Sequence, residues 1–185
     1  MGQPDAELVR RWQGGDAAAF EALVRRWQEP VARFLARLVG PHGPVTDLCQ
    51  DTFLRAYLAG TRYRDNGSFS TWLFQIALNA ARDHGRRSAR RPQPLPGGEM
   101  PVPADAEDQC QRRELAEAVA RAVAELPPPL REVLALRHDR GMNFEAMARL
   151  LGVPASTLKS RFAVALRRLH TRLSELGWGA EETLP

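Results

Sequence analysis

The sequence contains only two cysteines, Cys49 and Cys110, and they lie far apart in the chain. No histidine pair accompanies them at a metal-ligand spacing, so neither a metal site nor another cofactor is predicted. Long hydrophobic runs are also missing, because no apolar segment approaches the roughly 20 residues needed to span a bilayer. The N-terminus has no apolar signal core. We therefore expect a reduced, cytoplasmic protein with no direct membrane insertion.

Acidic residues are absent from one long stretch, between Glu145 and Glu175. The net charge of the whole chain is +4, but it is unevenly distributed. Basic side chains outnumber acidic ones in residues 1–91 and 127–185, whereas acidic ones prevail in residues 92–126. Two basic modules joined by an acidic connector are suited to binding nucleic acid at two places.

The acid-free stretch begins with the pattern of a helix-turn-helix. Apolar residues recur at i, i+3, i+4 and i+7 from Phe144 to Leu151, which is the spacing of one buried helix face. Asn143 is a suitable N-terminal cap for this helix, and Gly152 ends it. A short turn and a second helix are expected to follow.

The second helix is predicted to have Pro154 at its first position, and Ser156 or Thr157 can help to cap it. Leu158 and Phe162 belong to its apolar stripe, while the opposite face is cationic or neutral. Such a face can replace counterions along a nucleic-acid backbone. A solvated face is the alternative, although solvated helices usually interleave glutamate with basic residues. The residues expected to contact DNA are Ser156, Thr157, Lys159, Ser160, Arg161, Arg167 and Arg168.

The N-terminal half shows helical periodicity throughout. Residues 5–39 are predicted to form two or three short helices, with Asp16 as a cap and a bend at Pro30. Thr46 or Asp47 can cap the next helix. This helix contains the apolar or aromatic residues Leu48, Phe53, Ala56, Tyr57 and Leu58, and its polar side carries Asp47, Gln50 and Asp51. On pattern alone these acids have two equally good explanations. They can form an interface, or they can simply be favoured by the dipole near a helix N-terminus.

Aromatic residues and arginines alternate in the segment that follows. Phe69 and Trp72 are predicted to be core residues, since large aromatic side chains mostly serve burial. The polar loop before them, residues 64–68, can receive bases displaced from a duplex, as loops of single-strand binders do. The arginines that can follow phosphates are Arg82, Arg86, Arg87, Arg90 and Arg91.

A change in composition divides the chain. Residues 92–111 are rich in proline, glycine and acids, a composition that predicts a flexible linker. Helical stripes resume near Arg112 and are interrupted at residues 127–129 and at Gly141. The predicted fold is therefore all-α, with two small helical domains, 1–91 and 112–185, the second of which contains the helix-turn-helix.

Three stretches carry a family resemblance: DLCQDTFLRAY at 47–57, GSFSTWLFQIALNAARDHGRR at 67–87 and LPPPLREVLALRHDRGMNFEAMARLLGVPASTLKSR at 126–161. A proline-rich gap separates the last two. In this order they resemble the sigma factors of bacterial RNA polymerase, and specifically the extracytoplasmic-function group of the sigma-70 family. This group keeps only the second and fourth conserved regions, and the resemblance covers nearly the whole chain.

The resemblance implies a transcription initiation factor that binds core RNA polymerase, directs it to promoters and helps to melt the minus-ten element. Residues matching the segment that holds the polymerase clamp helices are Asp47, Gln50, Asp51 and Phe53. Residues matching the minus-ten segment are Asp65, Asn66, Ser68, Ser70, Asn79, Arg82, Arg86 and Arg87. Residues 156–161 match the segment that reads the minus-thirty-five element in the major groove.

The alternative is a helix-turn-helix repressor or activator that binds duplex DNA as a symmetric dimer and carries a helical sensing domain. The sequence has no obvious dimerisation helix, and a sensor would not need the arginine-and-aromatic stretch. An enzyme is not expected, because no nucleophile–base pair, metal cluster or phosphate loop is present. The resemblance further implies core RNA polymerase, promoter DNA and an anti-sigma factor as partners, in a stress response.

Overall fold

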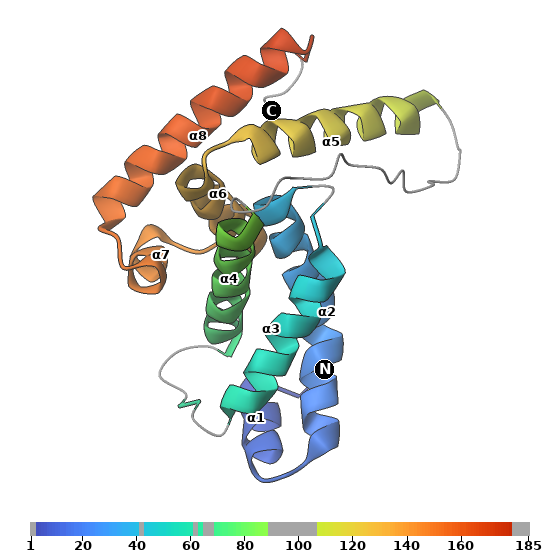
Figure 1. Cartoon of the computed structure of the whole chain (residues 1–185), viewed down its shortest axis with the longest axis vertical. Helices are drawn as coiled ribbons and strands as arrows, with labels where there is room; N and C mark the ends of the chain where they lie inside the picture. Colours follow the sequence, from blue (N-terminus) through green and yellow to red (C-terminus); the bar gives the residue numbers. More distant parts are fainter. Residues whose placement is uncertain (1–2, 41–42, 61–62, 65–68, 89–106, 179–185) are drawn as a thin grey trace. The chain divides into compact units, whose positions relative to one another are not determined.

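The computed structural model describes residues 3–40, 43–60, 63–64, 69–88 and 107–178 (Figure 1). Within these ranges the chain forms eight α-helices and no strand, which confirms the all-α prediction. The helices are α1 (Asp5–Gln13), α2 (Ala17–Val39), α3 (Val45–Ala59), α4 (Phe69–Ser88), α5 (Glu107–Glu125), α6 (Pro128–Arg140), α7 (Phe144–Leu151) and α8 (Ala155–Glu175). None of them is long and apolar enough to cross a lipid bilayer.

The chain divides into two compact units, one of residues 1–36 and 44–92 and the other of residues 37–43 and 93–185. Helix α5 begins at Glu107, so residues 107–111, which we predicted to belong to the linker, are helical. The remainder of the predicted linker, residues 92–106, lies outside the described residues. Each unit is described below by itself.

Helices α1 and α2 are joined by a turn that is capped as the sequence predicts. The carboxylate of Asp16 accepts a hydrogen bond from the backbone N–H of Ala19 at 3.3 Å and pairs with Arg11 at 2.7 Å. The two helices up to residue 39 agree with the predicted two or three, but α2 is longer than predicted, because it continues as one helix through Pro30. Val31 and Phe34, on the far side of the proline, are fully buried, and their burial offsets the lost backbone hydrogen bond.

Aromatic contacts hold the first unit together. The rings of Trp12 and Phe20 lie 4.7 Å apart, and those of Phe20 and Tyr57 lie 5.2 Å apart, which joins α1, α2 and α3. A second pair, Phe34 and Phe74 at 5.0 Å, joins α2 to α4. Helices α3 and α4 pack along their length, as Figure 1 shows. Aromatic side chains therefore join α2 to each of the other three helices of this unit.

The predicted cap of α3 was wrong. Pro44, and not Thr46 or Asp47, occupies the N-cap position, so both of those residues lie inside the first turn. Two of the large apolar side chains of α3 are exposed, Tyr57 at 52% and Leu58 at 71%. The helix has more apolar residues than its one packed face can cover.

The second unit packs α5, α6 and α7 against α8. Its core includes Val123, Leu126, Leu130, Leu134 and Ala165. The guanidinium of Arg131 donates hydrogen bonds to the carbonyls of residues 124 and 126, at 2.7 and 2.8 Å, and so satisfies acceptors at the end of α5. An exposed ion pair between Arg172 and Glu125, at 2.9 Å, also links α8 to α5.

The helix-turn-helix is formed by α7 and α8. Asn143 caps α7 as predicted, since its side chain accepts a hydrogen bond from the N–H of Ala146 at 2.8 Å. Gly152 ends α7 with φ of 66°, a left-handed conformation that favours glycine. The predicted start of α8 was wrong by one residue. Pro154 is extended and occupies the N-cap, and no side chain caps the helix, so neither Ser156 nor Thr157 serves as its cap.

Candidate nucleic-acid interface

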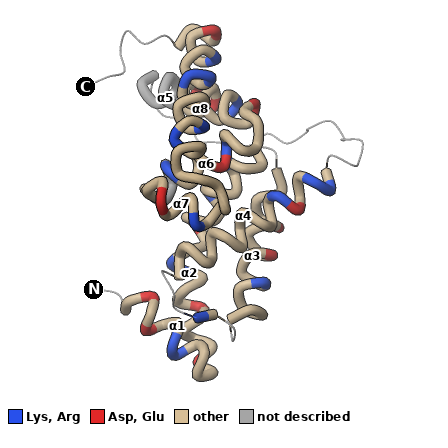
Figure 2. Tube along the Cα trace, turned by 90° about the vertical axis from the view of Figure 1, so that its left-hand side faces the viewer, with Lys and Arg blue, Asp and Glu red and all other residues tan. Residues whose placement is uncertain are grey.

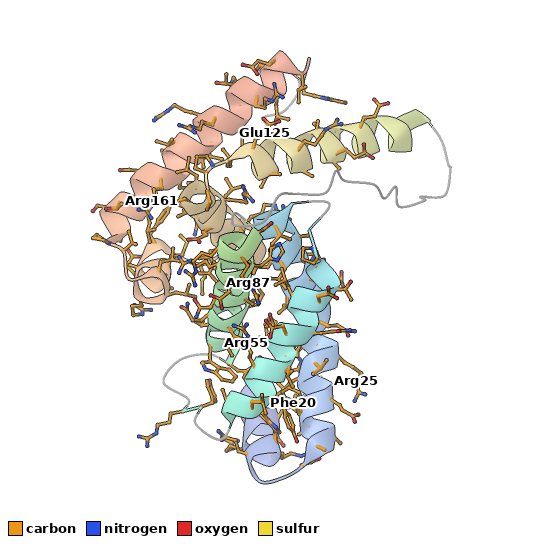
Figure 3. The ribbon with its side chains drawn as sticks, viewed as in Figure 1. Phe20, Arg25, Arg55, Arg87, Glu125 and Arg161 are labelled. Carbon is orange, nitrogen blue, oxygen red and sulfur yellow. The ribbon has the colours of Figure 1, made fainter. Side chains whose placement is uncertain are left out.

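Helix α8 separates its buried and exposed faces cleanly. Leu158 and Ala165 are fully buried against the rest of the second unit. Basic positions recur along α8 (Figure 2), and the side chain of Arg161 is drawn in Figure 3. The residues of α8 predicted to contact DNA are all exposed or partly exposed: Ser156, Thr157, Lys159, Ser160, Arg161, Arg167 and Arg168. The described part of α8 contains no acid before Glu175. The surface therefore has the exposure and the charge that binding to a nucleic-acid backbone requires.

An aromatic ring supports the first turns of this surface. The ring of Phe144 lies 5.9 Å from that of Phe162, edge to face, and the ammonium of Lys159 lies 5.9 Å from the Phe144 ring centre. The guanidinium of Arg137 lies 5.6 Å from the same centre. Cation–π contacts of this kind contribute roughly 0.5–1 kcal/mol at exposed sites. Phe144 thus holds two cations beside the turn between α7 and α8.

Helix α3 presents a mixed polar and apolar surface. Asp47 and Gln50 are exposed, but Phe53 is only 8% exposed and packs into the unit. The sequence-based assignment of Phe53 to the polymerase contact is therefore not matched by an accessible side chain. Its neighbour Leu54, which sequence reasoning missed, is 58% exposed and lies beside Leu58.

Leu54, Tyr57 and Leu58 form an exposed apolar patch at i, i+3 and i+4 on α3. Large apolar side chains that gather on one helix face mark interaction surfaces more often than scattered ones do. The sequence did contain a signal for this patch, because the apolar positions of residues 48–58 cover more than one helix stripe. Which apolar stripe of α3 is buried depends on the helix that packs against it, so the sequence of α3 alone does not decide it.

Only some of the residues predicted to bind the minus-ten element lie on the described surface. Asp65, Asn66 and Ser68 lie outside the described residues. Ser70 is only 6% exposed, so its side chain is not part of the surface. The side chains of the remaining four predicted residues emerge from α4; they are Asn79, Arg82, Arg86 and Arg87.

Among these, Asn79 is exposed and accepts a hydrogen bond from the amide of Gln75 at 3.2 Å. Arg82 is partly buried, whereas Arg86 and Arg87 are exposed near the end of α4 (Figure 3 labels Arg87). The arginines thus extend over the last turns of the helix, as the alternation of aromatic and basic residues predicts.

An aromatic cluster lies at the start of α4. The ring of Tyr63 is 4.7 Å from that of Trp72 and 6.0 Å from that of Phe69. Phe69 is buried and Trp72 partly so, in agreement with the predicted core role. Gln13 of α1 donates hydrogen bonds of 2.8 Å to the carbonyls of both Gly60 and Tyr63. Helix α1 therefore supports the described residues that precede the predicted base-binding loop.

A network of charges joins α3 to α4. Arg55 binds both carboxylate oxygens of Asp51, at 2.9 and 2.8 Å, and reaches Asp83 of α4 at 3.2 Å. Arg86 pairs with the other oxygen of Asp83. Hydrogen bonds from Arg55 and then from Arg86 hold the pKa of the Asp83 carboxyl below its ordinary value. Asp83 is therefore ionised at neutral pH, and an arginine binds each of its carboxylate oxygens.

The described residues include no group of three or more side chains that could hold a metal ion. Cys49 is partly buried, and its thiol lies 3.8 Å from the carbonyl of Gln28. Burial raises the pKa of this thiol, which keeps it protonated and weakly nucleophilic. The side chain of Cys110 lies outside the described residues.

The comparisons with known proteins assign the chain to a family. The models of Sigma-70 region 2 and Sigma-70 region 4 match residues 23–91 and 116–169. The ECF RNA polymerase sigma-E factor of Salmonella typhimurium is 33% identical over 183 residues, covering 93% of this chain and 95% of that protein. The chain belongs to the extracytoplasmic-function sigma factors. The RNA polymerase sigma-H factor of Pseudomonas aeruginosa is 30% identical, covering 94% of this chain and 96% of that protein.

Solved structures agree with this assignment. CnrH, in a complex with the cytosolic domain of CnrY, has a TM-score of 0.67 and 26% identity, covering 92% of this chain and 97% of that chain. The sigma factor RpoE of Bartonella quintana, in a complex with the anti-sigma factor NepR, has a TM-score of 0.68 over 84% of this chain and 96% of that chain. At 22% identity it shows the fold alone.

As an extracytoplasmic-function sigma factor, the protein is a transcription initiation factor that directs RNA polymerase to promoters. It is not an enzyme, because members of this family supply promoter recognition while the polymerase carries out RNA synthesis. The family assignment also removes the alternative of a dimeric regulator with a sensing domain.

Proposed function

We propose a division of labour between the two parts of the chain. Residues 1–91 bind polymerase and melt the minus-ten element, residues 112–185 read the minus-thirty-five element, and residues 92–111 connect them. The support comes from the family matches at 23–91 and 116–169 together with the acid-free exposed face of α8. This face is the single observation that carries the minus-thirty-five assignment.

Core polymerase is proposed to bind the outer face of α3. Asp47, Gln50 and Asp51 supply polar contacts, and the exposed Leu54 and Leu58 supply the apolar area that a lasting contact needs. The buried Phe53 supports this face from inside the unit and does not touch the clamp helices. The exposed apolar patch supports the proposal, because a protein helix can cover it.

The minus-ten element is proposed to bind α4 and the loop before it. Asn66 and Ser68 receive unstacked bases, while Arg82, Arg86 and Arg87 contact the backbone. Support comes from the surface positions of the arginines and from the aromatic cluster of Tyr63, Phe69 and Trp72 beside the loop. Ser70 contributes to the core of this region and not to the contact surface.

An anti-sigma factor is proposed as a further partner. CnrH was solved with the cytosolic domain of CnrY, and the Bartonella quintana RpoE with the anti-sigma factor NepR. The patch on α3 offers an apolar surface of the kind that a helical inhibitor covers. We place both this partner and the sigma factor itself in the cytoplasm, where the polymerase works.

Run-off transcription with core polymerase on a promoter library tests the proposed function. The expected result is transcription from a subset of templates that share one minus-ten and one minus-thirty-five motif. Gel filtration of the free chain should show a monomer. A dimer that shifts duplex DNA without polymerase, and gives no transcript from any template, would exclude the division of labour proposed above.

A further inference from the structure

A small pocket on the first unit lies where α3 meets α4. Its lining residues are Arg55, Asp83, Arg86 and Arg87, and its volume is about 260 Å³. This is several times the share of one water molecule in the liquid, roughly 30 Å³, and is enough for a phosphate group. Three of the four lining residues are arginines, so the pocket selects for an anion. Arg55 and Arg87 face this region from the two helices (Figure 3).

Asp83 already fills the role of that anion. One of its oxygens accepts a hydrogen bond from Arg55 at 3.2 Å, and the other is bound by Arg86. Carboxylates and phosphates present oxygen pairs of similar spacing to a guanidinium fork, which is why arginine binds both. The aspartate therefore occupies the same donors that a phosphate oxygen would use. Arg87 is exposed and lies beside them.

We propose that Asp83 is an internal competitor for the DNA backbone. It occupies Arg55 and Arg86 in the free protein, and a phosphodiester of the promoter takes its place at these two guanidinium groups. The proposal rests on the proposed minus-ten contact of α4 and assigns two further residues, Arg55 and Asp83, to it. Neither residue was singled out by the sequence patterns.

The competitor lowers affinity for every DNA sequence alike, because phosphate contacts carry no sequence information. Only a promoter, which adds base contacts, then remains bound at physiological salt. Asp51 keeps Arg55 in place during the exchange, since it binds a different edge of the same guanidinium with two hydrogen bonds. The site thus stays assembled when Asp83 is displaced.

The test measures binding of polymerase holoenzyme to a fluorescent promoter fork over a series of salt concentrations. Asp83→Asn keeps the size of the side chain and removes its charge. We expect roughly three- to tenfold tighter binding to promoter and non-promoter forks alike, with a salt slope close to that of the wild type, because the same phosphate contact forms once Asp83 is displaced. Arg55→Gln should weaken binding and make the slope shallower by about 0.7–0.9, the value of one lost phosphate contact.

The matched control is Glu29→Gln on α2. Glu29 pairs with Arg33 at 2.9 Å on an exposed surface, so this variant makes the same charge change without touching the pocket. Circular dichroism melting of each variant checks that the fold is retained. Any general effect of net charge appears in both Asp83→Asn and Glu29→Gln and is subtracted.

Two results would overturn the proposal. If Asp83→Asn behaves like Glu29→Gln, Asp83 serves only to pair the helices. If Asp83→Asn weakens binding, the aspartate orients the arginines and does not compete with DNA. Failure of the wild-type holoenzyme to bind the fork at any salt concentration would instead refute the proposed minus-ten contact itself.

Discussion

Lys159 and Arg161 lie two positions apart on α8, so they leave the helix in different directions and have different surroundings. Lys159 lies over the ring of Phe144, close to the turn between the helices, whereas Arg161 is partly exposed on the helix surface. A compact ammonium near a helix start suits a phosphate, while a guanidinium fork can bind two acceptors of one guanine. Their roles in binding the minus-thirty-five element should therefore differ.

We expect Arg161→Ala to change which minus-thirty-five sequence is preferred, because a lost base contact costs on the order of 1–3 kcal/mol at one position only. Lys159→Ala should weaken binding to all sequences equally and reduce the salt slope. Holoenzyme binding to a randomised minus-thirty-five library measures both effects. Arg121→Ala, which removes an exposed arginine from α5, is the control. An unchanged preference and affinity for Arg161→Ala would show that this side chain does not read bases.

Asp83 gives a prediction about pH at the same scale. Its pKa is lowered in the folded protein, first by Arg55 and then by Arg86. A carboxyl with a lowered pKa stabilises the fold above its unfolded pKa, and this stabilisation is lost as the pH falls through the folded pKa. The link between α3 and α4 should therefore be intact at neutral pH and weaken only in acid, below about pH 4.

The carboxyl carbon of Asp83, followed by NMR during an acid titration, measures this pKa directly. The midpoint should lie below the ordinary value, and Arg55→Gln should raise it. A midpoint for Asp83 at or above the ordinary value would contradict the network as described.

At the scale of helices, the sequence best predicted the features that depend only on residues close to one another in the chain. The cap at Asn143 and the left-handed end at Gly152 are local, and both appear as expected. The continuation of α2 through Pro30 was missed, because it depends on burial of Val31 and Phe34 against other helices. Local propensity favoured a break there, and packing prevailed.

In the candidate site, too, local features were predictable from the sequence and features decided by packing were not. The exposed face of α8 was predictable, since an acid-free amphipathic helix shows its two sides in the sequence. The burial of Phe53 and Ser70 was not, because it is decided by the packing of α3 against α4. Exposure of Leu54 and Leu58 was missed for the converse reason: an apolar residue in a helix normally predicts core.

We expect Leu54→Ser combined with Leu58→Ser to leave the stability of the first unit within about 0.5 kcal/mol per site, because both side chains are already largely exposed. Affinity for core polymerase should fall by about tenfold or more, since central apolar contacts carry most interface energy. Thermal melting and competition binding to core polymerase measure the two quantities. Leu176→Ser, at a 40% exposed leucine that follows α8, is the control. Unchanged polymerase affinity would exclude this patch from the contact.

At the scale of the whole chain, the protein has two compact units, and a proline-rich, acidic segment lies between the regions that match the two family models. Holding two binding modules on one chain raises the effective concentration of the second module once the first is bound. Under the division of labour proposed above, contacts of polymerase and promoter to each unit would add up to a stable complex. Any other partner that contacts both units also benefits from this raised effective concentration.

We therefore predict that a dedicated anti-sigma factor binds both units of the free protein and covers the α3 patch of Leu54, Tyr57 and Leu58. Such a partner excludes core polymerase, because both compete for the same apolar surface. Co-purification from the native host at endogenous expression, followed by addition of core polymerase, measures this directly. The anti-sigma factor should be displaced as polymerase is added. The double variant Leu54→Ser with Leu58→Ser should capture less anti-sigma factor and less polymerase. The control Leu176→Ser should capture as much of each as the wild type. Recovery of only free and polymerase-bound protein would instead mean that the factor is controlled through its own synthesis.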